Sequence, residues 1–376
     1  MSSSNLPRRP RLPRAAALTM AALLGGAVLT ACGSEDGTGD GTAAGGLNLV
    51  ASTTVYADIA EQVAGGNATV ESVISDPAAD PHSYEASPAD AAAVTNADLV
   101  VYNGAGYDAF VDRALENAPD VPVVRAVDEY ARVTGETVAE HSHDDDHGHD
   151  DHGGDAHGDD EHGDDGHDDH SGDGHDEGHD DHGGDSHGHD DHASDTNEHV
   201  WFSLPTAAAV AERVAEELAT IDEENAEEYR DNARRFADTL TPLEEQIDAI
   251  HDRGHFPYAQ TERVGAHLFD AAHMVDLTPR GFLSSIEDDT DPSAADLAAM
   301  LDLIADREVA FLAFNNQTET PVTARVRDAA ESADVVVVDL TETLPEGMDY
   351  TTWMTDIVDS LSSALDGATP VADGGH

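Results

Sequence analysis

A tract of histidine and acidic residues from His141 to His192 limits, more than any other feature, how this chain can fold. The tract contains only His, Asp, Glu, Gly and Ser with a single Ala, and it holds 15 of the chain's 22 histidines. A segment without apolar side chains cannot bury enough surface to offset the entropy of ordering it. We therefore expect a disordered loop over residues 141–192, with folded sequence on both sides.

The N-terminus has the pattern of a bacterial export signal. Four arginines between Arg8 and Arg14 precede an uncharged, largely apolar run from Ala15 to Ala31. The run is short for a membrane-spanning anchor, and it ends in "LTAC", which resembles a lipobox and contains Cys32, the chain's only cysteine. We expect residues 1–32 to be a lipoprotein signal peptide ending at the lipidated Cys32. Residues 33–46 then form a flexible tether to the extracytoplasmic face of the cell membrane.

The charge of the chain restricts its partners. With 17 basic and 79 acidic residues, the formal net charge is -62. Nucleic acids and anionic membrane surfaces both attract basic patches, so this chain is not expected to bind either. Its contact with the membrane is expected to be the lipid anchor alone. Binding of a cation remains compatible with this negative charge.

Strand-like and helix-like segments alternate in both halves of the chain, which predicts two α/β domains with mainly parallel sheets. The long charged segment from Thr206 to His251 is helical in pattern, and Pro242 is expected to bend or interrupt it. A helix of this length is typical of a rigid strut. The predicted units are an N-terminal domain (47–221, including the loop), a connecting helix (222–252), a C-terminal domain (253–366) and a tail (367–376).

Several potential metal ligands follow predicted strands, where ligands collect in open α/β sheets. Two imidazoles and two carboxylates neutralise a divalent ion, and four protein ligands leave no position for a reacting water. Such a site holds an ion rather than activating one. Each residue could also be an ordinary surface or strand-end side chain. The candidates are His82, His199, Glu262, Asp339 and Glu342.

Four stretches of the sequence resemble one bacterial family. They are "DPHSYEASPADAAAVTNADLVVYNGAGYD", "NEHVWFSLP", "VAFLAFNNQTETPVTARVRDAA" and "ETLPEGMDYTTWM". They are similar to motifs of the ZnuA-like lipoproteins, the metal-binding solute receptors of zinc/manganese ABC importers. The resemblance covers roughly Leu47 to Leu365 apart from the tract. "NEHVWFSLP" departs from the family by having Glu198 where proline is usual.

The resemblance implies a ligand set. His82 and His199 match the first two ligands, Glu262 matches the third with His267 as the fallback, and Glu342 matches the fourth with Asp339 as the alternative. It also implies two Rossmann-like α/β domains joined by one long rigid helix, with the metal in the cleft between them. Because the joining helix is stiff, domain closure should be modest.

The function that the resemblance implies is capture of Zn²⁺ and its delivery to an ABC permease by a monomeric lipoprotein. Receptors for Mn²⁺ or iron, and a surface adhesin, remain alternatives. A zinc hydrolase is less favoured because the chain has no HExxH motif, and "HDRGH" (251–255) contains a helix-disfavouring glycine. The chain is therefore not expected to be an enzyme.

The histidines of the tract suggest a role in the same process. Neutral imidazole suits zinc, copper and nickel. We hypothesise that the tract gathers or senses zinc for the buried site, the alternative being a solvated acidic loop without a role. The weak sites would begin with His141, His143, His147, His149 and His152.

Overall fold

A computed structural model describes residues 46–77, 79, 81–138 and 197–371 of the chain. The predicted signal peptide, the lipidation site Cys32 and nearly all of the tether lie outside these residues. The tract with its five named histidines and residues 372–376 also lie outside them. The structure therefore bears on the two α/β halves and on what connects them.

The N-terminal half contains a four-stranded parallel sheet with strand order β2-β1-β3-β4. The central strand β3 is buried along its whole length, which explains its uninterrupted apolar sequence. Ser87 caps α2 through a capping box with Asp90, and Pro88 occupies the first turn, as the Ser-Pro pair predicts. The elements are β1 (Leu47–Thr53), α1 (Thr54–Ala64), β2 (Ala68–Ile74), α2 (Pro88–Thr95), β3 (Leu99–Tyr102), α3 (Ala109–Leu115), β4 (Val123–Arg125) and α4 (Ala126–Thr134).

The C-terminal half repeats this topology with strand order β6-β5-β7-β8, again all parallel. In both halves the second strand along the chain lies at one edge and the first strand lies beside it. The prediction of two α/β units with parallel sheets is thus confirmed. The elements are β5 (Pro257–Gln260), the 3₁₀ helix η2 (Arg263–Gly265), α7 (Ala266–Ala271), β6 (Val275–Asp276), α8 (Arg280–Glu287), α9 (Ala294–Ala305), β7 (Phe311–Asn315), α10 (Pro321–Ser332), β8 (Val336–Leu340) and α11 (Tyr350–Ala364).

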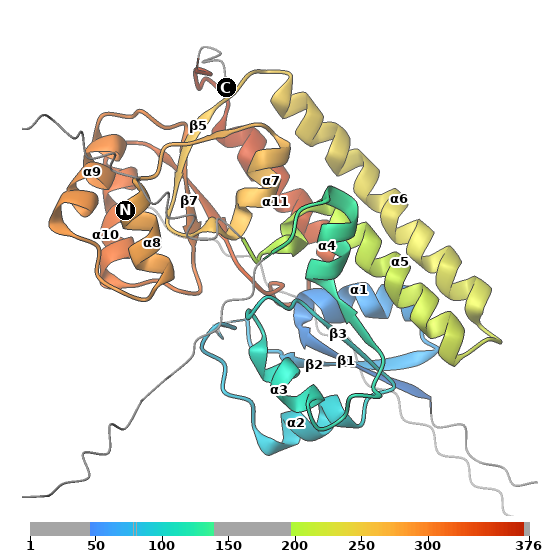
Figure 1. Cartoon of the computed structure of the whole chain (residues 1–376). Coiled ribbons are helices and arrows are strands. Elements are labelled where there is room, and N and C mark those ends of the chain that lie inside the picture. The colour runs from blue at the N-terminus through green and yellow to red at the C-terminus, as the bar shows by residue number, and fades with distance from the viewer. Residues whose placement is uncertain (1–45, 78, 80, 139–196, 372–376) are drawn as a thin grey trace, which may run out of the picture. The chain divides into compact units, whose positions relative to one another are not determined.

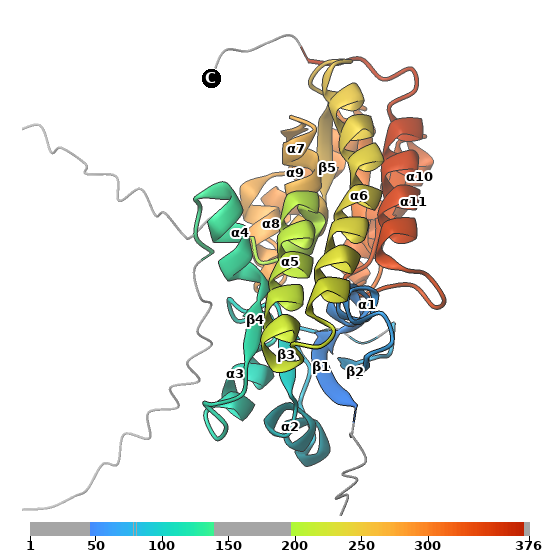
Figure 2. The same cartoon turned by 90° about the vertical axis from the view of Figure 1, so that its right-hand side faces the viewer.

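Two helices connect the halves, α5 (Leu204–Ile221) and α6 (Ala226–His251), after the short 3₁₀ helix η1 (Val200–Phe202). They pack against each other, and Figure 2 shows α6 running beside α1 of the first half and α11 of the second. The Asn232 side chain donates a 2.8 Å hydrogen bond to the Val63 carbonyl of α1. Just beyond the other end of α6, Arg253 donates to the Leu365 carbonyl at 2.8 Å. The long helix is therefore fastened to both halves.

The two halves also share one apolar core. Tyr56 from the first half, Phe236 from α6 and Trp353 from the second half belong to the same buried cluster. Tyr350, at the start of α11, donates a 2.6 Å hydrogen bond to the Trp201 carbonyl. A joint filled by large buried side chains resists bending, because separating the halves would expose them to water.

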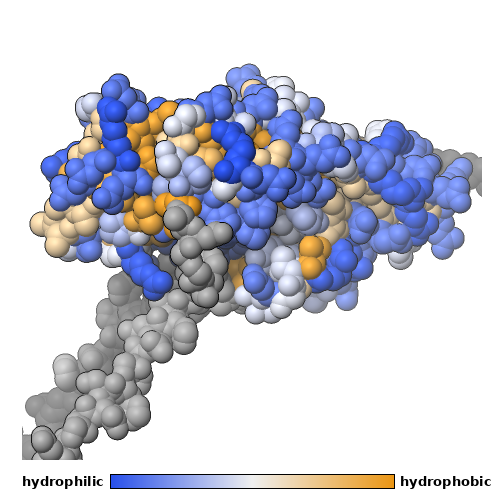
Figure 3. Space-filling model, turned by 90° about the horizontal axis from the view of Figure 1, so that it is seen from above, coloured by the Kyte–Doolittle hydropathy of each residue, from blue (hydrophilic) through white to orange (hydrophobic). Residues whose placement is uncertain are grey.

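The surface matches the acidic composition of the chain. Figure 3 shows a mainly hydrophilic face with a few scattered apolar areas. Among the helices of the described residues, none combines the length and the apolar character that crossing a bilayer requires.

Candidate metal site

Three of the predicted ligand residues follow the ends of parallel strands. His82 lies in the loop between β2 and α2, Glu262 follows β5, and Glu342 follows β8. His199 directly precedes η1, close to the point where the described chain resumes at residue 197. His82, Glu262 and Glu342 all follow the carboxyl ends of parallel strands, where ligands collect in open α/β sheets.

The structure brings His82, His199 and Glu342 together from distant parts of the chain. Oε2 of Glu342 lies 3.4 Å from Nε2 of His82 and 3.7 Å from Nε2 of His199. The two imidazole rings are 5.6 Å apart between centroids. A histidine pair from the first half thus faces a carboxylate from the second half.

A hydrogen bond to Asn197 orients the His199 ring. Nδ1 of His199 lies 2.6 Å from the Asn197 side-chain oxygen, an acceptor, so Nδ1 carries the proton. Asn197 is itself held because its side-chain amide donates to the Arg263 carbonyl at 2.9 Å. Nε2 is consequently left with its lone pair available, which is the form that binds a metal.

Three buried polar atoms at this place have no hydrogen bond, and one of them is the hydroxyl of Tyr107, whose ring lies 4.9 Å from that of His82. Nε2 of His199 and Oε2 of Glu342 are both buried, and neither finds a hydrogen-bond partner among the described residues. Burying such an atom without a partner costs about 1–3 kcal/mol. An imidazole nitrogen with a free lone pair and an ionised carboxylate oxygen both bind metal ions. A cation between the two atoms would therefore satisfy both. The residues present therefore fit a bound divalent ion.

Glu342 is fully buried yet favours its charged form. Burial raises the pKa of its carboxyl group, but the imidazoles of His199 and His82, when protonated in the absence of a metal, outweigh burial and hold the pKa well below its usual range. Its other oxygen, Oε1, accepts a 2.7 Å hydrogen bond from the Asn315 side chain. Glu342 is thus an ionised, oriented carboxylate with one oxygen left for a ligand.

Glu262 differs from Glu342 in its protonation. Burial raises its pKa to about 7, although hydrogen bonds from Thr318 and Asn315 act in the opposite direction. The Asn315 side-chain nitrogen lies 2.6 Å from Oε2 of Glu262 and also donates to Glu342. One amide therefore holds both carboxylates in place. Near neutral pH a cation would have to displace a proton from Glu262.

Three residues near these ligands were not among the predicted ones. Oε1 of Glu198 lies 3.9 Å from Nδ1 of His82, and Glu198, His82 and His199 each offer a ligand atom within 4.8 Å of the others. Asn315 ends β7, so the strand-end rule could have found it. Gln317 donates to the carbonyls of Pro77 and Ala79 at 2.7 and 3.1 Å, so it links the halves beside the His82 loop.

The two fallback residues lie in other environments. Nε2 of His267 is 2.9 Å from the Asn197 carbonyl oxygen, and its ring lies against Tyr130. Burial lowers the pKa of His267. Asp339 is about half exposed and forms an ion pair with Arg327 at 3.1 Å. In this structure His267 supports the loop that carries His199, and Asp339 is a surface partner of an arginine.

A sequence model of one protein family matches residues 49–364, which is most of the chain. The family is described as ZnuA, the periplasmic component A of a zinc-uptake complex. The chain belongs to the ZnuA family. This family comprises metal-binding solute receptors of zinc and manganese ABC importers rather than enzymes, in agreement with the sequence-based prediction.

The ZnuA-family relatives differ in the metal that they are named for. The manganese-binding lipoprotein MntA of Halalkalibacterium halodurans is 36% identical over 97 residues, which are 26% of this chain and about a third (32%) of that protein. The zinc-binding lipoprotein AdcA of Streptococcus pneumoniae is 23% identical over 312 residues, covering 82% of this chain and 52% of AdcA. The chain thus spans between a third and about half of the length of these relatives.

A solved structure has the same fold. The solute-binding protein FpvC of Pseudomonas aeruginosa, determined in complex with Mn²⁺, aligns with a TM-score of 0.59 at 17% identity. The alignment covers 85% of this chain and 98% of FpvC. At this identity the likeness establishes the arrangement of two sheets and joining helices, which agrees with the predicted fold class.

Proposed function

We propose that this protein captures a divalent transition metal outside the cytoplasm, with Zn²⁺ as its cargo, and delivers the ion to the permease of an ABC importer. The proposed ligands are His82, His199, Glu262 and Glu342. The observation that carries the proposal is the pair of buried, unpartnered atoms, Nε2 of His199 and Oε2 of Glu342, which lie 3.7 Å apart. An ion is the simplest group that satisfies both.

The proposed ligand set is suited to holding an ion and not to chemistry on it. Two neutral imidazoles and two carboxylates neutralise a divalent cation, and a four-ligand shell has no vacant position for a reacting water. Both carboxylates are oriented by Asn315, and His199 is oriented by Asn197. These supporting hydrogen bonds reduce the cost of assembling the shell around the metal.

The choice between zinc and manganese rests on the donors. Imidazole favours Zn²⁺, whereas Mn²⁺ prefers oxygen ligands and a larger coordination number. Two histidines on one ion, and a histidine-rich tract in the same chain, favour zinc. The specific observation in favour of manganese is Glu198, whose carboxylate adjoins His82 and would supply a further oxygen. We therefore keep a manganese receptor as the second candidate.

Paired carboxylate variants test the site. Glu342→Gln should weaken zinc binding by about a hundredfold or more, because it removes a ligand and its charge. Asp339→Asn, three residues earlier and paired with Arg327 in this structure, should bind zinc within about twofold of wild type. Trp201 lies 5.2 Å from the His199 ring, so its fluorescence in a chelator-competition titration reports this site and not the tract.

The same titration separates the two candidate cargoes. Zinc that binds more tightly than manganese by several orders of magnitude supports the first proposal, whereas a chain that retains manganese in competition with zinc supports the second. Equal binding by wild type and Glu342→Gln would refute the site as proposed. If Asp339→Asn weakened zinc binding and Glu342→Gln did not, the fourth ligand would be Asp339.

The proposed location follows from the N-terminal sequence and from the relatives. Cys32 would carry the lipid that holds the protein at the extracytoplasmic face of the cell membrane. MntA and AdcA are named as lipoproteins. Because α6 and the shared core make the joint stiff, the ion would be transferred with modest movement of the halves.

We further propose that the tract at residues 141–192 supplies zinc to this site. Four residues separate His192 from Asn197, the hydrogen-bond partner of His199, and five Cα–Cα steps span at most about 18 Å. Histidines tethered at this range raise the local zinc concentration beside the site. Deleting residues 141–192 should lower the number of zinc ions bound per chain and leave the tightest site intact. An unchanged stoichiometry would contradict this role.

A further inference from the structure

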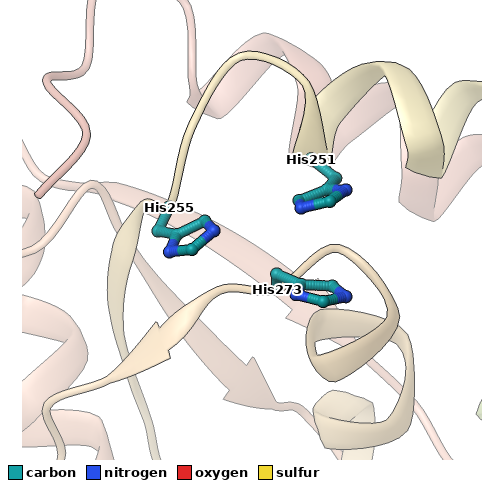
Figure 4. A group of neighbouring side chains, drawn as sticks. All are labelled: His251, His255 and His273. Atoms are coloured by element: carbon teal, nitrogen blue, oxygen red, sulfur yellow. The ribbon is translucent and has the colours of Figure 1, made fainter. Parts of the chain in front are cut away.

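A second group of histidines lies apart from the site described above. His251 ends α6, His255 lies in the loop between α6 and β5, and His273 lies in the turn between α7 and β6 (Figure 4). One nitrogen from each ring lies within 4.8 Å of one nitrogen from each of the others. The rings of His251 and His273 stack with centroids 4.1 Å apart, and His255 lies 5.9 and 6.1 Å from them.

This group lies at the amino ends of the C-terminal strands, whereas the first site lies at their carboxyl ends. His255 comes just before β5 and His273 just before β6, so both precede the amino ends of parallel strands. Glu262 and Glu342 follow the carboxyl ends of β5 and β8. Because parallel strands run in one direction, the two groups are separated by the length of the sheet. An ion bound at one group could not be shared with the other.

The fold fixes the backbone that carries these three histidines. Gly254 has φ +117°, which permits the tight turn from His251 to His255, and the His255 carbonyl accepts a 2.8 Å hydrogen bond from the Val371 amide. His273 has φ +52°, a left-handed conformation that few residues with side chains adopt. Its amide donates to the Asp270 carbonyl at 2.9 Å. Ile250, Phe256 and Met274, the neighbours of these histidines in sequence, are buried in the core.

The chemistry of the group is that of a borderline-soft metal site. Three of the six histidines that the structure describes meet here, although repulsion would separate them whenever they are protonated. Three imidazole nitrogens suit Zn²⁺, Cu²⁺ and Ni²⁺, and they do not suit Mn²⁺, Mg²⁺ or Ca²⁺. Three protein ligands leave a fourth tetrahedral position for water.

We infer that His251, His255 and His273 form a second binding site for zinc, copper or nickel, one that excludes manganese. The bound ion would tie the end of α6 to the loops that lead into β5 and β6. The site is independent of the cargo site and does not rest on the proposed function. It would fasten the connecting helix to the C-terminal sheet in a metal-dependent way.

Histidine footprinting tests this inference in the complete mature chain. Diethyl pyrocarbonate modifies accessible imidazoles, and peptide mass spectrometry reports each histidine separately from those of the tract. Zn²⁺ should slow modification of His251, His255 and His273 together, over one concentration range, and Mn²⁺ should not. If zinc left the modification rates of all three histidines unchanged, the site would be refuted.

Two variants make the test specific. His273→Asn removes the imidazole, and asparagine tolerates the left-handed backbone, so the turn is preserved. It should raise the zinc concentration needed to protect His251 and His255 by about a hundredfold. Asp289→Asn, at another left-handed position (φ +52°) away from these histidines, should leave protection unchanged. Should the first variant fail to fold, His251→Asn provides the same comparison.

A third variant separates this inference from the proposed function. Glu342→Gln disables the cargo site and should leave zinc protection of His251, His255 and His273 unchanged. Protection that disappears in Glu342→Gln, or that persists undiminished in His273→Asn, would contradict a second site.

Discussion

Asn315 is the residue that allows two carboxylates to lie side by side at the first site. The side-chain oxygen of Asn315 accepts a 3.0 Å hydrogen bond from the backbone N–H of Gln317. The side-chain nitrogen of Asn315 must therefore face the opposite way. That nitrogen donates to Glu262 and Glu342 at 2.6 and 2.7 Å. Asn315 partly offsets the repulsion between the two groups. The pKa of Glu262 is nevertheless raised, chiefly by burial and to a smaller extent by the charge of Glu342.

The protonation of Glu262 leads to a prediction for the metal-free protein. Burial raises its pKa from 4.5 to about 7, so the folded state holds a proton that the unfolded state releases. The stability contributed by this proton is fully present below pH 4.5 and is lost as the pH rises through about 7, an effect on the order of 3 kcal/mol. Glu262→Gln has no such proton, so it should gain stability relative to wild type between pH 5 and pH 8. Urea unfolding with excess chelator measures the difference.

Glu346→Gln is the matched control for the loss of one negative charge. Glu346 is exposed in the loop before α11 and lies outside the buried site. If the stability difference between Glu262→Gln and wild type does not change from pH 5 to pH 8, or changes equally for Glu346→Gln, Glu262 is not protonated in the metal-free protein.

Residue type and position alone indicated much of the candidate site. Ligands of open α/β sheets bind beyond the carboxyl ends of the strands, so the strand pattern of the sequence points to His82, Glu262, Asp339 and Glu342. The preference for Glu342 over Asp339 comes from the family resemblance, and the ligand set stays a prediction.

The strand pattern is not enough to name the hydrogen bonds that prepare these side chains. The tautomer of His199 depends on Asn197, whose own partner is the Arg263 carbonyl, 66 positions further along the chain. No local pattern encodes such a contact.

At the scale of elements, long segments with a clear pattern were predicted well. The repeated alternation of strands and helices, the Ser-Pro start of α2 and the long α6 all follow from local sequence. Short elements were missed because tertiary contacts define them. The two-residue strand β6 exists only through its pairing with β5, and α8 was not predicted. The short strand β4 ends at Arg125, and α4 begins at the next residue.

The connecting helix shows how packing outweighs a local signal. Pro242 was expected to bend or interrupt the helix, yet α6 is a single helix from Ala226 to His251 with Pro242 inside it. The neighbouring Leu240 and Leu243 are buried in the shared core, together with Phe236 and Ile247. Burial of an apolar stripe on this scale exceeds the cost of one lost backbone hydrogen bond. The strut therefore continues from one half to the other.

At the scale of the molecule, the two α/β halves share a continuous core and are expected to behave as one folded unit. The described residues from 46 onward belong to one compact unit. Tyr350, from the second half, lies between Phe236 of α6 and Trp353, and Trp353 contacts Phe202, which follows Trp201. Neither half could unfold alone without exposing large aromatic side chains of the other. Equilibrium unfolding should consequently be a single transition.

The only two tryptophans of the chain test this, since Trp201 reports the first half and Trp353 the second. In Trp353→Phe and Trp201→Phe, the remaining tryptophan should report one urea midpoint that coincides with the far-UV signal. Zinc at about a hundred times its dissociation constant should stabilise both halves by the same amount, about 2.7 kcal/mol, because it binds residues from each. Two outcomes would mean that the halves unfold separately and that the joint between them is not stiff. One is a zinc effect on only one of the two tryptophan signals. The other is a urea midpoint that differs between the tryptophan and far-UV signals.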